Sequence, residues 1–382
     1  MSVVQFENYR QNPAAWVAPQ LAVIVPSYNE RDNVALLYEK VGAALGGVAF
    51  EFIVVDDNSP DGTSDVVREM ARQHPNVRGI RRIGRRGLSS AVIEGIMASS
   101  APYFAVIDAD LQHDEAILPQ MLAKAVAGDD IVVGTRYSGD GSAGQGLSRA
   151  REAGSRFATR LSGLLTGQSL SDPMSGFFLM RREVFDQVVQ TLSEDGFKIL
   201  LDIIVSANRF HALNGKTLKI GEVPYTFRPR HAGESKMSPI IVVQFLGLLV
   251  SKLSRGLLPT SFLLFGLVGG LGVIVHMGTL WITHERLGFN FFWGQTAAVI
   301  VAMTFNFMLN NELTYANKKL RGWRYLTGLL TFYAVCSIGA LANVSVASWI
   351  YAFDGSFYLA GLLGVLMSVV FNYSVTRVFT WR

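Results

Sequence analysis

An acidic motif ends one of the apolar stretches of this 382-residue chain. Residues 108–114 read DADLQHD, so one residue separates Asp108 from Asp110, and Gln112 follows shortly after. Carboxylate and amide oxygens at the end of a strand are suitable ligands for Mg²⁺ or Mn²⁺. Such an ion would neutralise the charge that develops on a departing nucleotide diphosphate. A lone D-x-D pair is more often a solvated turn, so spacing alone does not decide between the two.

A second pair of carboxylates occurs in the sequence VVDDNSPDGT. Asp56 and Asp57 close a predicted strand and lead into residues typical of turns. A carboxylate at this position either accepts hydrogen bonds from a nucleotide base or ribose, or caps the helix that follows. The first predicted strand, over 20–25, ends in PSYNE, which would place Tyr28 and Glu30 at the same edge of a sheet.

Two further segments carry groups suited to phosphate. FRPRHAGESK contains Arg228, Arg230 and Lys236 around a flexible Ala-Gly, and LSRAREAGSRF contains Arg151 and Ser155. Guanidinium groups bind phosphate oxygens through paired hydrogen bonds. The alternative is that these charges only contact the headgroups of membrane lipids.

The elements that would position these residues alternate between strands and helices. Short apolar runs predict buried strands at 20–25, 51–55, 103–110 and 130–137. Helical periodicity occurs between and after them, at 30–46, 61–74, 89–100 and 115–127. This alternation predicts an α/β domain with a Rossmann-like, mostly parallel sheet. In such sheets ligands bind at the carboxyl ends of the strands, where the acidic motifs lie.

The composition divides the chain into a polar and an apolar part. Apolar residues make up 50% of the sequence and the mean hydropathy is +0.29, which is too apolar for an ordinary soluble enzyme. Most charged residues lie in 1–238, which we expect to form the α/β domain. Residues 239–258 combine apolar side chains with Lys252 and Arg255, as expected for a helix in the membrane interface. Residues 259–382 are predicted to form an all-α transmembrane domain.

Four apolar segments in this last part are long enough to cross a membrane: 259–283, 291–312, 325–353 and 356–379. The loop after the second, ANKKLRGWR, is rich in lysine and arginine, whereas the loop after the third carries only Asp354. Since positive charge marks the cytoplasmic side, we expect both termini and the α/β domain in the cytoplasm. The N-terminal sequence also lacks the pattern of a signal peptide.

Charge and cysteine content narrow the class of partner. The formal net charge is +4 and the isoelectric point is about 9.1. Because the basic residues cluster near apolar segments, we expect them to meet anionic lipid rather than nucleic acid. The single cysteine, Cys336, lies in an apolar run, which excludes disulfides within the chain and a cysteine-based metal site.

The apolar part contains a short internal repeat. FNFMLNNELTY at 305–315 aligns with FNYSVTRVFTW at 371–381, which places Asn306 over Asn372. Each copy closes a predicted spanning helix at the same face of the membrane. The repeat therefore predicts two related helical hairpins.

Taken together, these motifs resemble those of a known family. PSYNE, VVDDNSPDGT, GLSSA, DADLQHD, GTRY, DPMSGF, GFK and EVPYTFRPRHAGESK follow one another over about 21–238. In this order they are similar to motifs of the dolichyl-phosphate mannose synthase group of inverting family 2 glycosyltransferases. The apolar part resembles the GtrA-type four-helix domain often fused to such enzymes, through its helix number and its FNxxxxR-like ends. Asn311 stands in the first copy where the second has Arg377, so a role tied to that arginine does not carry over.

The resemblance implies a GT-A fold and a set of site residues. Nucleotide contacts would fall on Pro26, Tyr28, Glu30, Val55 and Asp57. Metal and diphosphate would be held at Asp108, Ala109, Asp110 and Gln112, of which the metal ligands would be Asp108, Asp110 and Gln112. The donor would also be bound by Arg136, Lys198, Arg230 and Lys236, and the acceptor phosphate by Arg151 and Ser155. The catalytic residues would be Asp110, Arg136 and Arg230.

The resemblance further implies the reaction. Mannose would pass from GDP-mannose to a membrane polyprenyl (dolichyl) phosphate with inversion, in a reaction that depends on Mg²⁺ or Mn²⁺. A lipid monophosphate is already anionic, so the acceptor needs no strong base. Arginine, lysine and metal would instead bring two anions together. UDP-glucose or another UDP-sugar is the alternative donor, since related enzymes share nearly all these motifs.

Two other functions fit parts of the sequence. A processive polysaccharide synthase predicts a Q-x-x-R-W motif and more spans, and the sequence has neither. A non-catalytic role, in which the apolar part moves or presents lipid-linked sugar, favours degenerate acidic motifs, yet Asp108 and Asp110 are both present. A combined role, in which the membrane half also helps to flip the product, stays open.

Overall fold

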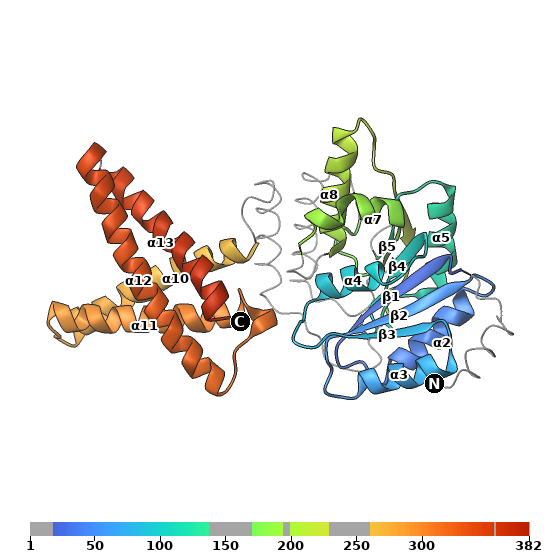
Figure 1. The fold of residues 1–382 in the computed structure, drawn as a ribbon, viewed down its shortest axis with the longest axis horizontal. Coiled ribbons are helices and arrows are strands. Elements are labelled where there is room, and N and C mark those ends of the chain that lie inside the picture. Colours follow the sequence, from blue (N-terminus) through green and yellow to red (C-terminus); the bar gives the residue numbers. More distant parts are fainter. Residues whose placement is uncertain (1–17, 137–169, 194–198, 229–259, 355–356, 382) are drawn as a thin grey trace, which may run out of the picture. The chain divides into compact units, whose positions relative to one another are not determined.

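The computed structural model describes residues 18–136, 170–193, 199–228, 260–354 and 357–381 of the chain. The chain divides into two compact units, Met1–Met237 and Ser238–Arg382. The first unit is an α/β fold and the second is built from helices (Figure 1).

Seven strands form one sheet in the first unit, in the order β3-β2-β1-β4-β6-β5-β7. Their bounds are β1 Leu21–Ser27, β2 Phe50–Asp56, β3 Val77–Arg81, β4 Tyr103–Val106, β5 Ile131–Thr135, β6 Phe178–Arg181 and β7 Ile220–Pro224. Neighbouring strands are parallel except at β6, which runs antiparallel to β4 and β5. The predicted α/β fold with a mostly parallel sheet is therefore confirmed. The carboxyl ends of β1, β2, β4 and β5 share one side of the sheet, here called the carboxyl edge.

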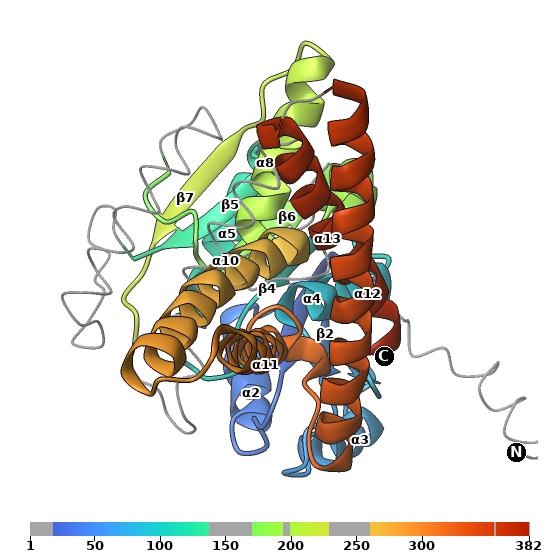
Figure 2. The same ribbon diagram turned by 90° about the vertical axis from the view of Figure 1, so that its left-hand side faces the viewer.

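Helices cover both faces of this sheet (Figures 1 and 2). One face packs against α2 (Val34–Ala44), α3 (Thr63–Gln73) and α5 (Leu118–Ala127). The other packs against α4 (Leu88–Met97), α7 (Arg182–Val188) and α8 (Ile199–Leu213). Successive strand residues serve opposite faces, so that Val23 joins the first layer and Ile24 the second. Because both faces are covered, the central strands are apolar almost throughout.

The sequence pattern reveals four of these strands and misses three. The strand expected over 103–110 is shorter than predicted, since β4 ends at Val106 and the two aspartates lie in the loop beyond it. β3 has mostly exposed residues and carries two arginines, so it lacks an apolar run. β6 runs directly into α7 at Arg182 with no turn between them, and β7, IGEVP, includes Glu222 and ends in Pro224, so neither is an apolar run bounded by turn residues.

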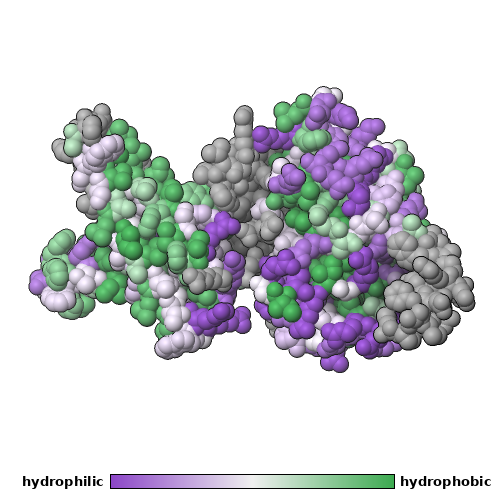
Figure 3. Space-filling model, viewed as in Figure 1, coloured by the Kyte–Doolittle hydropathy of each residue, from purple (hydrophilic) through white to green (hydrophobic). Residues whose placement is uncertain are grey.

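The second unit contains four long helices, α10 Thr260–Trp281, α11 Phe291–Glu312, α12 Trp323–Asp354 and α13 Phe357–Phe379. They coincide with the four predicted segments. Over the described residues, three helical segments are long and apolar enough to cross a membrane: Ser261–Arg286, Phe291–Glu312 and Trp323–Ile350. In α13 the apolar segment is the shorter Leu363–Phe379. Figure 3 shows hydrophobic residues over much of the visible surface of this unit, as a membrane interior favours.

The internal repeat appears as two hairpins with the same internal contact. α10 packs on α11, and α12 packs on α13 (Figures 1 and 2). In the first hairpin, the amide of Asn306 lies so close to Gly272 that a Cβ on the glycine would overlap it. Asn372 lies against Gly339 in the same way. Glycine at these positions lets two helices approach closely. Asn306 and Asn372 therefore occupy equivalent positions in the two hairpins, as their alignment predicts.

Aromatic contacts between the hairpins follow the same symmetry. Phe307 of α11 has its ring centroid 5.7 Å from that of Phe332 of α12. Its counterpart in the repeat, Tyr373 of α13, lies 5.8 Å from Phe265 of α10. Each hairpin thus inserts an aromatic ring from its second helix against the first helix of the other hairpin.

The correspondence between the two copies does not extend to Asn311 and Arg377, which occupy the same position of the alignment. Asn311 is buried, and its side-chain oxygen accepts hydrogen bonds from Leu320 N at 2.8 Å and Trp381 Nε1 at 3.1 Å. Trp381 in turn stacks on Tyr315, with ring centroids 4.1 Å apart. Arg377, the equivalent of Asn311, is exposed. The asparagine therefore joins the two copies internally, whereas the exposed arginine donates to the Tyr373 hydroxyl of its own helix at 3.2 Å.

We expect Gly272→Val and Gly339→Val each to destabilise the second unit by about 1–3 kcal/mol, because the added methyl groups overlap the facing asparagine. Thermal unfolding of the detergent-solubilised full-length protein measures this. Gly270→Val is the control, since that glycine lies on the same helix with open space around it. A Gly272→Val protein as stable as the Gly270→Val protein would contradict the close approach of the helices.

Candidate active site

The loops that follow β1 and β2 are joined by hydrogen bonds from backbone to side chain. Asn29 N donates to Ser59 Oγ at 2.8 Å, and Glu30 N donates to Thr63 Oγ1 at 3.1 Å. Both loops turn at an asparagine with positive φ, Asn29 and Asn58, which tolerates this conformation better than most residues. The PSYNE segment is therefore held in place by the turn NSPDGT, residues 58–63.

The two adjacent carboxylates after β2 have different roles. Asp56 is buried and accepts a hydrogen bond from Ser59 N at 3.3 Å. It also accepts from the hydroxyls of Ser59 and Ser64. Asp56 thus stabilises the turn and the start of α3, which is the structural alternative that the sequence left open. Asp57 instead faces the segment before α4.

A fully buried arginine holds Asp57. Arg82 Nε donates to Asp57 Oδ1 at 2.7 Å, and Gly87 N donates to Asp57 Oδ2 at 2.8 Å. The other guanidinium nitrogens reach Gly87 O, Ser90 Oγ and Glu94. A charge this deeply buried requires partners on several sides. Asp57 and the GLSSA segment therefore fix each other through Arg82, a residue to which the sequence pattern assigned no role.

The other residues expected to contact a nucleotide lie along the same edge. The guanidinium carbon of Arg86 lies 4.6 Å from the centroid of the Tyr28 ring, which places a cation over an aromatic face. Glu30 is buried and accepts a hydrogen bond at 2.8 Å from the N-cap side chain of α2. The side chains of Pro26 and Val55 are buried in the sheet, so a ligand could meet only their backbone.

The acidic loop, residues 108–115, turns sharply at Leu111, whose φ is +61°. This conformation costs a residue with a Cβ roughly 1–2 kcal/mol. Burial of the leucine side chain, worth about 1.5–3 kcal/mol, offsets that cost. The turn lets Gln112 N donate to Asp110 Oδ1 at 3.1 Å. Asp110 is buried, whereas the Asp108 side chain is 40% exposed.

A segment that follows β7, residues 225–228, lies across the acidic loop. Arg228 N donates to Gln112 O at 2.8 Å, and Gln112 Nε2 donates to Arg228 O at 3.2 Å. Arg228 also forms ion pairs with Asp114 at 2.6 Å and with Glu115 at 2.8 Å. The EVPYTFR motif therefore holds the DADLQHD motif, although the two are far apart in sequence.

His113 is the most enclosed polar residue of the acidic loop, with 4% of its surface exposed. Its Nδ1 lies 2.6 Å from the hydroxyl of Tyr225, and its Nε2 lies 3.3 Å from Asp108 Oδ2. The rings of Phe177 and Phe227 lie 5.4 and 5.6 Å from the imidazole, centroid to centroid. The histidine thus connects the acidic loop to two other segments of the first unit.

Arg136, at the end of β5, is held by a second loop. Its Nε and Nη2 donate to the two carboxylate oxygens of Asp172, at 2.7 and 3.0 Å, as a bidentate pair. Its guanidinium also lies 5.2 Å from the Phe227 ring centroid. Ser175, in the same loop as Asp172, donates to Gly134 O at 2.7 Å. The DPMSG loop is therefore bound to the strand that ends in GTRY.

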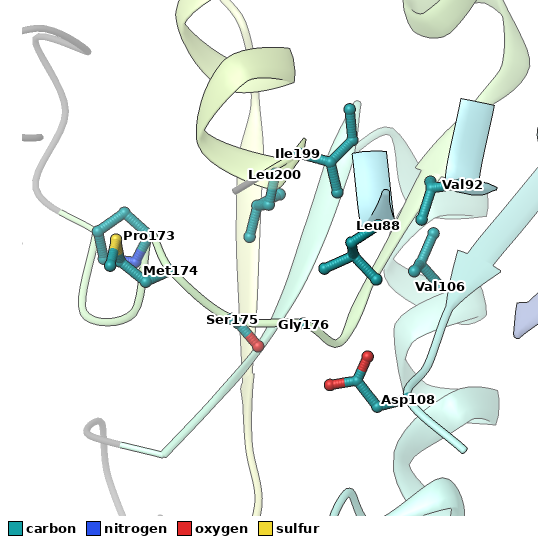
Figure 4. A pocket seen from close by; sticks show the side chains of 10 residues that line it. All are labelled: Leu88, Val92, Val106, Asp108, Pro173, Met174, Ser175, Gly176, Ile199 and Leu200. Carbon is teal, nitrogen blue, oxygen red and sulfur yellow. The ribbon is translucent and has the colours of Figure 1, made fainter. Parts of the chain in front are cut away.

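A small pocket opens beside Asp108 (Figure 4). The carboxylate points into it, opposite Ser175 and Gly176. Its remaining walls are mostly apolar and come from four separate segments: Leu88, Val92, Val106, Pro173, Met174, Ile199 and Leu200. Apolar walls strengthen the field of a carboxylate, because they lower the local dielectric constant.

The acidic loop offers oxygen ligands suited to a divalent cation. Asp108 and Asp110 flank the small, buried Ala109, and the Gln112 amide is oriented by its nitrogen, which donates to a backbone oxygen. Over the described residues, no group of three or more His, Cys, Asp or Glu is arranged to hold a metal ion. Two carboxylates leave several coordination positions for other ligands, as in Mg²⁺ sites that include phosphate oxygens. The loop therefore fits a cation shared with a diphosphate better than a closed structural metal site.

Ten of the predicted site residues lie within the described part of the chain and gather along the carboxyl edge: Pro26, Tyr28, Glu30, Val55, Asp57, Asp108, Ala109, Asp110, Gln112 and Arg136. The others lie outside the described residues: Arg151, Ser155, Lys198, Arg230 and Lys236. The predicted interfacial region, 239–258, also lies outside them. The roles predicted for both groups stay predictions.

Three further residues of the site were not singled out from the sequence: Asp172, Gly176 and Tyr225. They lie in the motifs DPMSGF and EVPYTFRPRHAGESK, whose order along the chain was recognised without a role for these positions. Their partners are distant in sequence, so no local pattern could have identified them.

Comparisons with known proteins agree with this arrangement. Residues 22–189 match the family described as glycosyl transferase family 2, and residues 264–381 match the GtrA/DPMS transmembrane domain. The dolichol-phosphate mannosyltransferase of Pyrococcus furiosus is 34% identical over 365 residues, which cover 95% of this chain and 99% of the relative. That of Saccharomyces cerevisiae is 34% identical over 231 residues, which cover 59% of this chain and 84% of the relative.

One solved structure with a similar fold is glucosyl-3-phosphoglycerate synthase from Mycobacterium tuberculosis in complex with Mn²⁺, UDP and glucosyl-3-phosphoglycerate. It matches with a TM-score of 0.48 and 16% identity, covering 66% of this chain and 84% of that one. A likeness at this level carries no argument about the substrate or the metal.

We expect Arg82→Met to destabilise the first unit by about 3–5 kcal/mol, because it leaves the Asp57 carboxylate in a buried position without its ion-pair partner. Arg85→Met is the matched control. Arg85 is 66% exposed and pairs with Glu94, which Arg82 also contacts, so its loss should cost at most about 1 kcal/mol. Thermal unfolding of the full-length variants compares the two. Equal stability of both variants would contradict the role given to the buried arginine.

Proposed function

The chain belongs to the dolichol-phosphate mannosyltransferase family of glycosyltransferases, and on this premise we propose that it transfers mannose from GDP-mannose to a membrane polyprenyl (dolichyl) phosphate. The observation that carries the proposal is the 34% identity to a dolichol-phosphate mannosyltransferase over nearly the whole length of both chains. GDP-mannose as the donor is supported by the similarity of RPRHAGESK to the mannosyl members of this group.

The donor would bind along the carboxyl edge. Contacts with the nucleoside are proposed for Tyr28 and Asp57, with Arg86 over the Tyr28 ring and Arg82 bonded to Asp57. The diphosphate would lie at the acidic loop, near Arg136. Further donor contacts are proposed for Glu30, for the backbone of Pro26 and Val55, and for Lys198, Arg230 and Lys236.

A divalent cation, Mg²⁺ or Mn²⁺, would be held by Asp108, Asp110 and Gln112 together with the diphosphate. When bound, it would neutralise negative charge on the departing nucleotide diphosphate. The fit rests on the hard oxygen ligands of the loop and on its open side at Asp108. Ala109 contributes its small size, because a larger side chain between the two aspartates would have to fit into a buried position.

The acceptor is proposed to react without a strong general base. A lipid monophosphate is ionised at neutral pH, so its oxygen is already a nucleophile. The protein must then place two anions next to each other, which cationic side chains achieve by position and electrostatics. Arg136 and Arg230 are proposed for this at the donor, and Arg151 and Ser155 at the acceptor phosphate. Attack on the anomeric carbon from the side opposite the diphosphate inverts its configuration.

The helical unit is proposed to keep the active site at the membrane surface, where the acceptor phosphate lies. The loop between α11 and α12 contains Lys318, Lys319, Arg321 and Arg324, and the loop between α12 and α13 contains Asp354. This asymmetry favours a cytoplasmic position for the first loop and for both termini. Residues 239–258 would then form an interfacial segment that joins residues 1–238 to the membrane domain, 259–382.

The donor is tested with purified full-length protein, polyprenyl phosphate, Mn²⁺ and a panel of radiolabelled GDP- and UDP-sugars. We expect label in the lipid phase only from GDP-mannose, because the motifs resemble the mannosyl members. Transfer from a UDP-sugar instead would replace the proposed donor and keep the enzyme class. Transfer from no donor would contradict the proposed activity.

The metal is tested with Asp110→Ala. We expect it to lower kcat by about 10²–10³-fold, a loss typical of removing one group that stabilises charge in the transition state. Chelation by EDTA should abolish transfer by the wild-type protein, and added Mn²⁺ should restore it. Asp65→Ala is the control, because this carboxylate is exposed on α3 and pairs with Arg68 of the same helix. Full activity of Asp110→Ala would refute the role of the acidic loop.

The fixed geometry of Arg136 gives a third test. We expect Arg136→Lys to lower kcat/KM by about 100-fold, because an ammonium group cannot form the bidentate pair with Asp172 and so misplaces the charge. Arg228→Lys is the comparison, since that arginine pairs with two acidic residues at separate nitrogens. A smaller loss for Arg136→Lys than for Arg228→Lys would contradict the proposed donor contact.

A further inference from the structure

A buried histidine in the acidic loop takes no direct part in the reaction proposed above. Three aromatic rings surround His113: Phe177, Tyr225 and Phe227, with centroids between 5.4 and 5.6 Å away. Such surroundings are common for a histidine that only fills a core. Here, however, both ring nitrogens have defined polar partners, the Tyr225 hydroxyl at 2.6 Å and Asp108 Oδ2 at 3.3 Å.

These partners determine which ring nitrogen carries a hydrogen. A carboxylate only accepts hydrogen bonds, so the Nε2 of His113 must donate to Asp108. In a neutral imidazole, Nδ1 is then an acceptor, and it takes the hydrogen of the Tyr225 hydroxyl. Burial raises the pKa of Tyr225 above its usual value; Arg136 lowers it, and nearby carboxylates raise it further. Tyr225 therefore keeps its proton and donates to His113, which in turn donates to Asp108.

A glycine confines the same carboxylate from another side. A Cβ at Gly176 would lie 2.8 Å from Asp108 Oδ2 and 3.4 Å from His113 Nε2. Figure 4 shows the Asp108 carboxylate directed toward this glycine and Ser175. The oxygen that accepts from the histidine is therefore limited by the backbone of the DPMSG loop. An exposed aspartate would otherwise rotate freely about its side-chain bonds.

From this geometry we propose that His113, oriented by Tyr225, is a positioning residue that fixes the Asp108 carboxylate for binding a divalent cation. The inference rests on the proposed function, since it takes the acidic loop as the metal site. Groups that orient a metal ligand through a hydrogen bond change metal affinity by about 10–100-fold when they are removed. Neither His113 nor Tyr225 needs to touch the substrate for this role.

Mn²⁺ binding to the full-length protein in detergent tests the proposal, with free Mn²⁺ measured by electron paramagnetic resonance in the presence and absence of GDP. His113→Phe keeps the aromatic packing and removes the donor to Asp108. His113→Gln restores an N–H donor near the position of Nε2. Tyr225→Phe removes only the hydroxyl that orients the ring. His211→Phe is the matched control, because His211 is 7% exposed and lies on α8, away from the acidic loop.

We expect His113→Phe and Tyr225→Phe to weaken Mn²⁺ binding by about 10-fold or more, with much of the loss recovered in His113→Gln and none seen in His211→Phe. In the transfer assay, the Mn²⁺ concentration for half-maximal rate should rise while kcat at saturating Mn²⁺ changes little. Wild-type Mn²⁺ affinity in both His113→Phe and Tyr225→Phe would overturn the proposal. If His113→Phe fails to fold, the Mn²⁺ affinity of Tyr225→Phe relative to the wild type tests the proposal in the same way.

The same titration separates this proposal from the proposed function. A wild-type protein that binds Mn²⁺, with weakened binding in the variants, supports the positioning role even where mannose is not the sugar transferred. A wild-type protein that transfers mannose but shows no Mn²⁺ binding overturns the metal site and the positioning role together. Transfer of mannose with unchanged Mn²⁺ affinity in the variants overturns the positioning role alone.

Discussion

Several carboxylates gather at the carboxyl edge of one sheet, and the first unit depends on giving each of them hydrogen-bond donors of its own. Asp56 accepts hydrogen bonds from serine hydroxyls, Asp57 from a buried arginine and a backbone amide, and Asp172 from an arginine that binds both of its oxygens. Without these donors, like charges brought to one edge would repel one another. The donors to Asp57 and Asp172 come from segments 25 or more residues away in sequence, so these hydrogen bonds also join separate loops. The hydrogen bonds that stabilise these carboxylates therefore also hold the loops of the site together.

In the helical unit, polar side chains also need hydrogen-bond partners, and here their surroundings are apolar. A polar side chain within a membrane must find its partners inside the protein. Asn311 does so through the backbone of Leu320 and the indole of Trp381, and it thereby joins the two halves of the repeat. The glycines that face Asn306 and Asn372 show that the repeat preserves a packing arrangement as well as a sequence. Arg377 departs from this arrangement, since an exposed cation stands where the first copy has the buried Asn311.

Prediction from sequence succeeded where the signal was local. Apolar runs and helical periodicity identified four strands and the four long helices, and the strand ends correctly indicated that Asp57, Asp108 and Asp110 lie at the carboxyl edge. It failed where the structure is determined by distant contacts. The antiparallel β6 runs directly into α7 without a turn to mark its end, and it lies between β4 and β5, which are distant from it in sequence. Arg82 lies beside a charged edge strand, and the tyrosine that contacts the acidic loop is more than a hundred residues away from it.

The charges around the acidic loop also affect how a nucleotide-sugar would bind there. Among the described residues, two arginines near the acidic loop are already engaged, Arg136 with Asp172 and Arg228 with Asp114 and Glu115. Their positive charge is therefore largely balanced before any ligand arrives. A diphosphate brought to Asp108 and Asp110 would add negative charge beside two carboxylates, which is unfavourable unless a cation lies between them. If the acidic loop holds the cation as proposed, donor binding and cation binding would each favour the other, and a carboxylate held in one orientation would lower the entropic cost of bringing the two together.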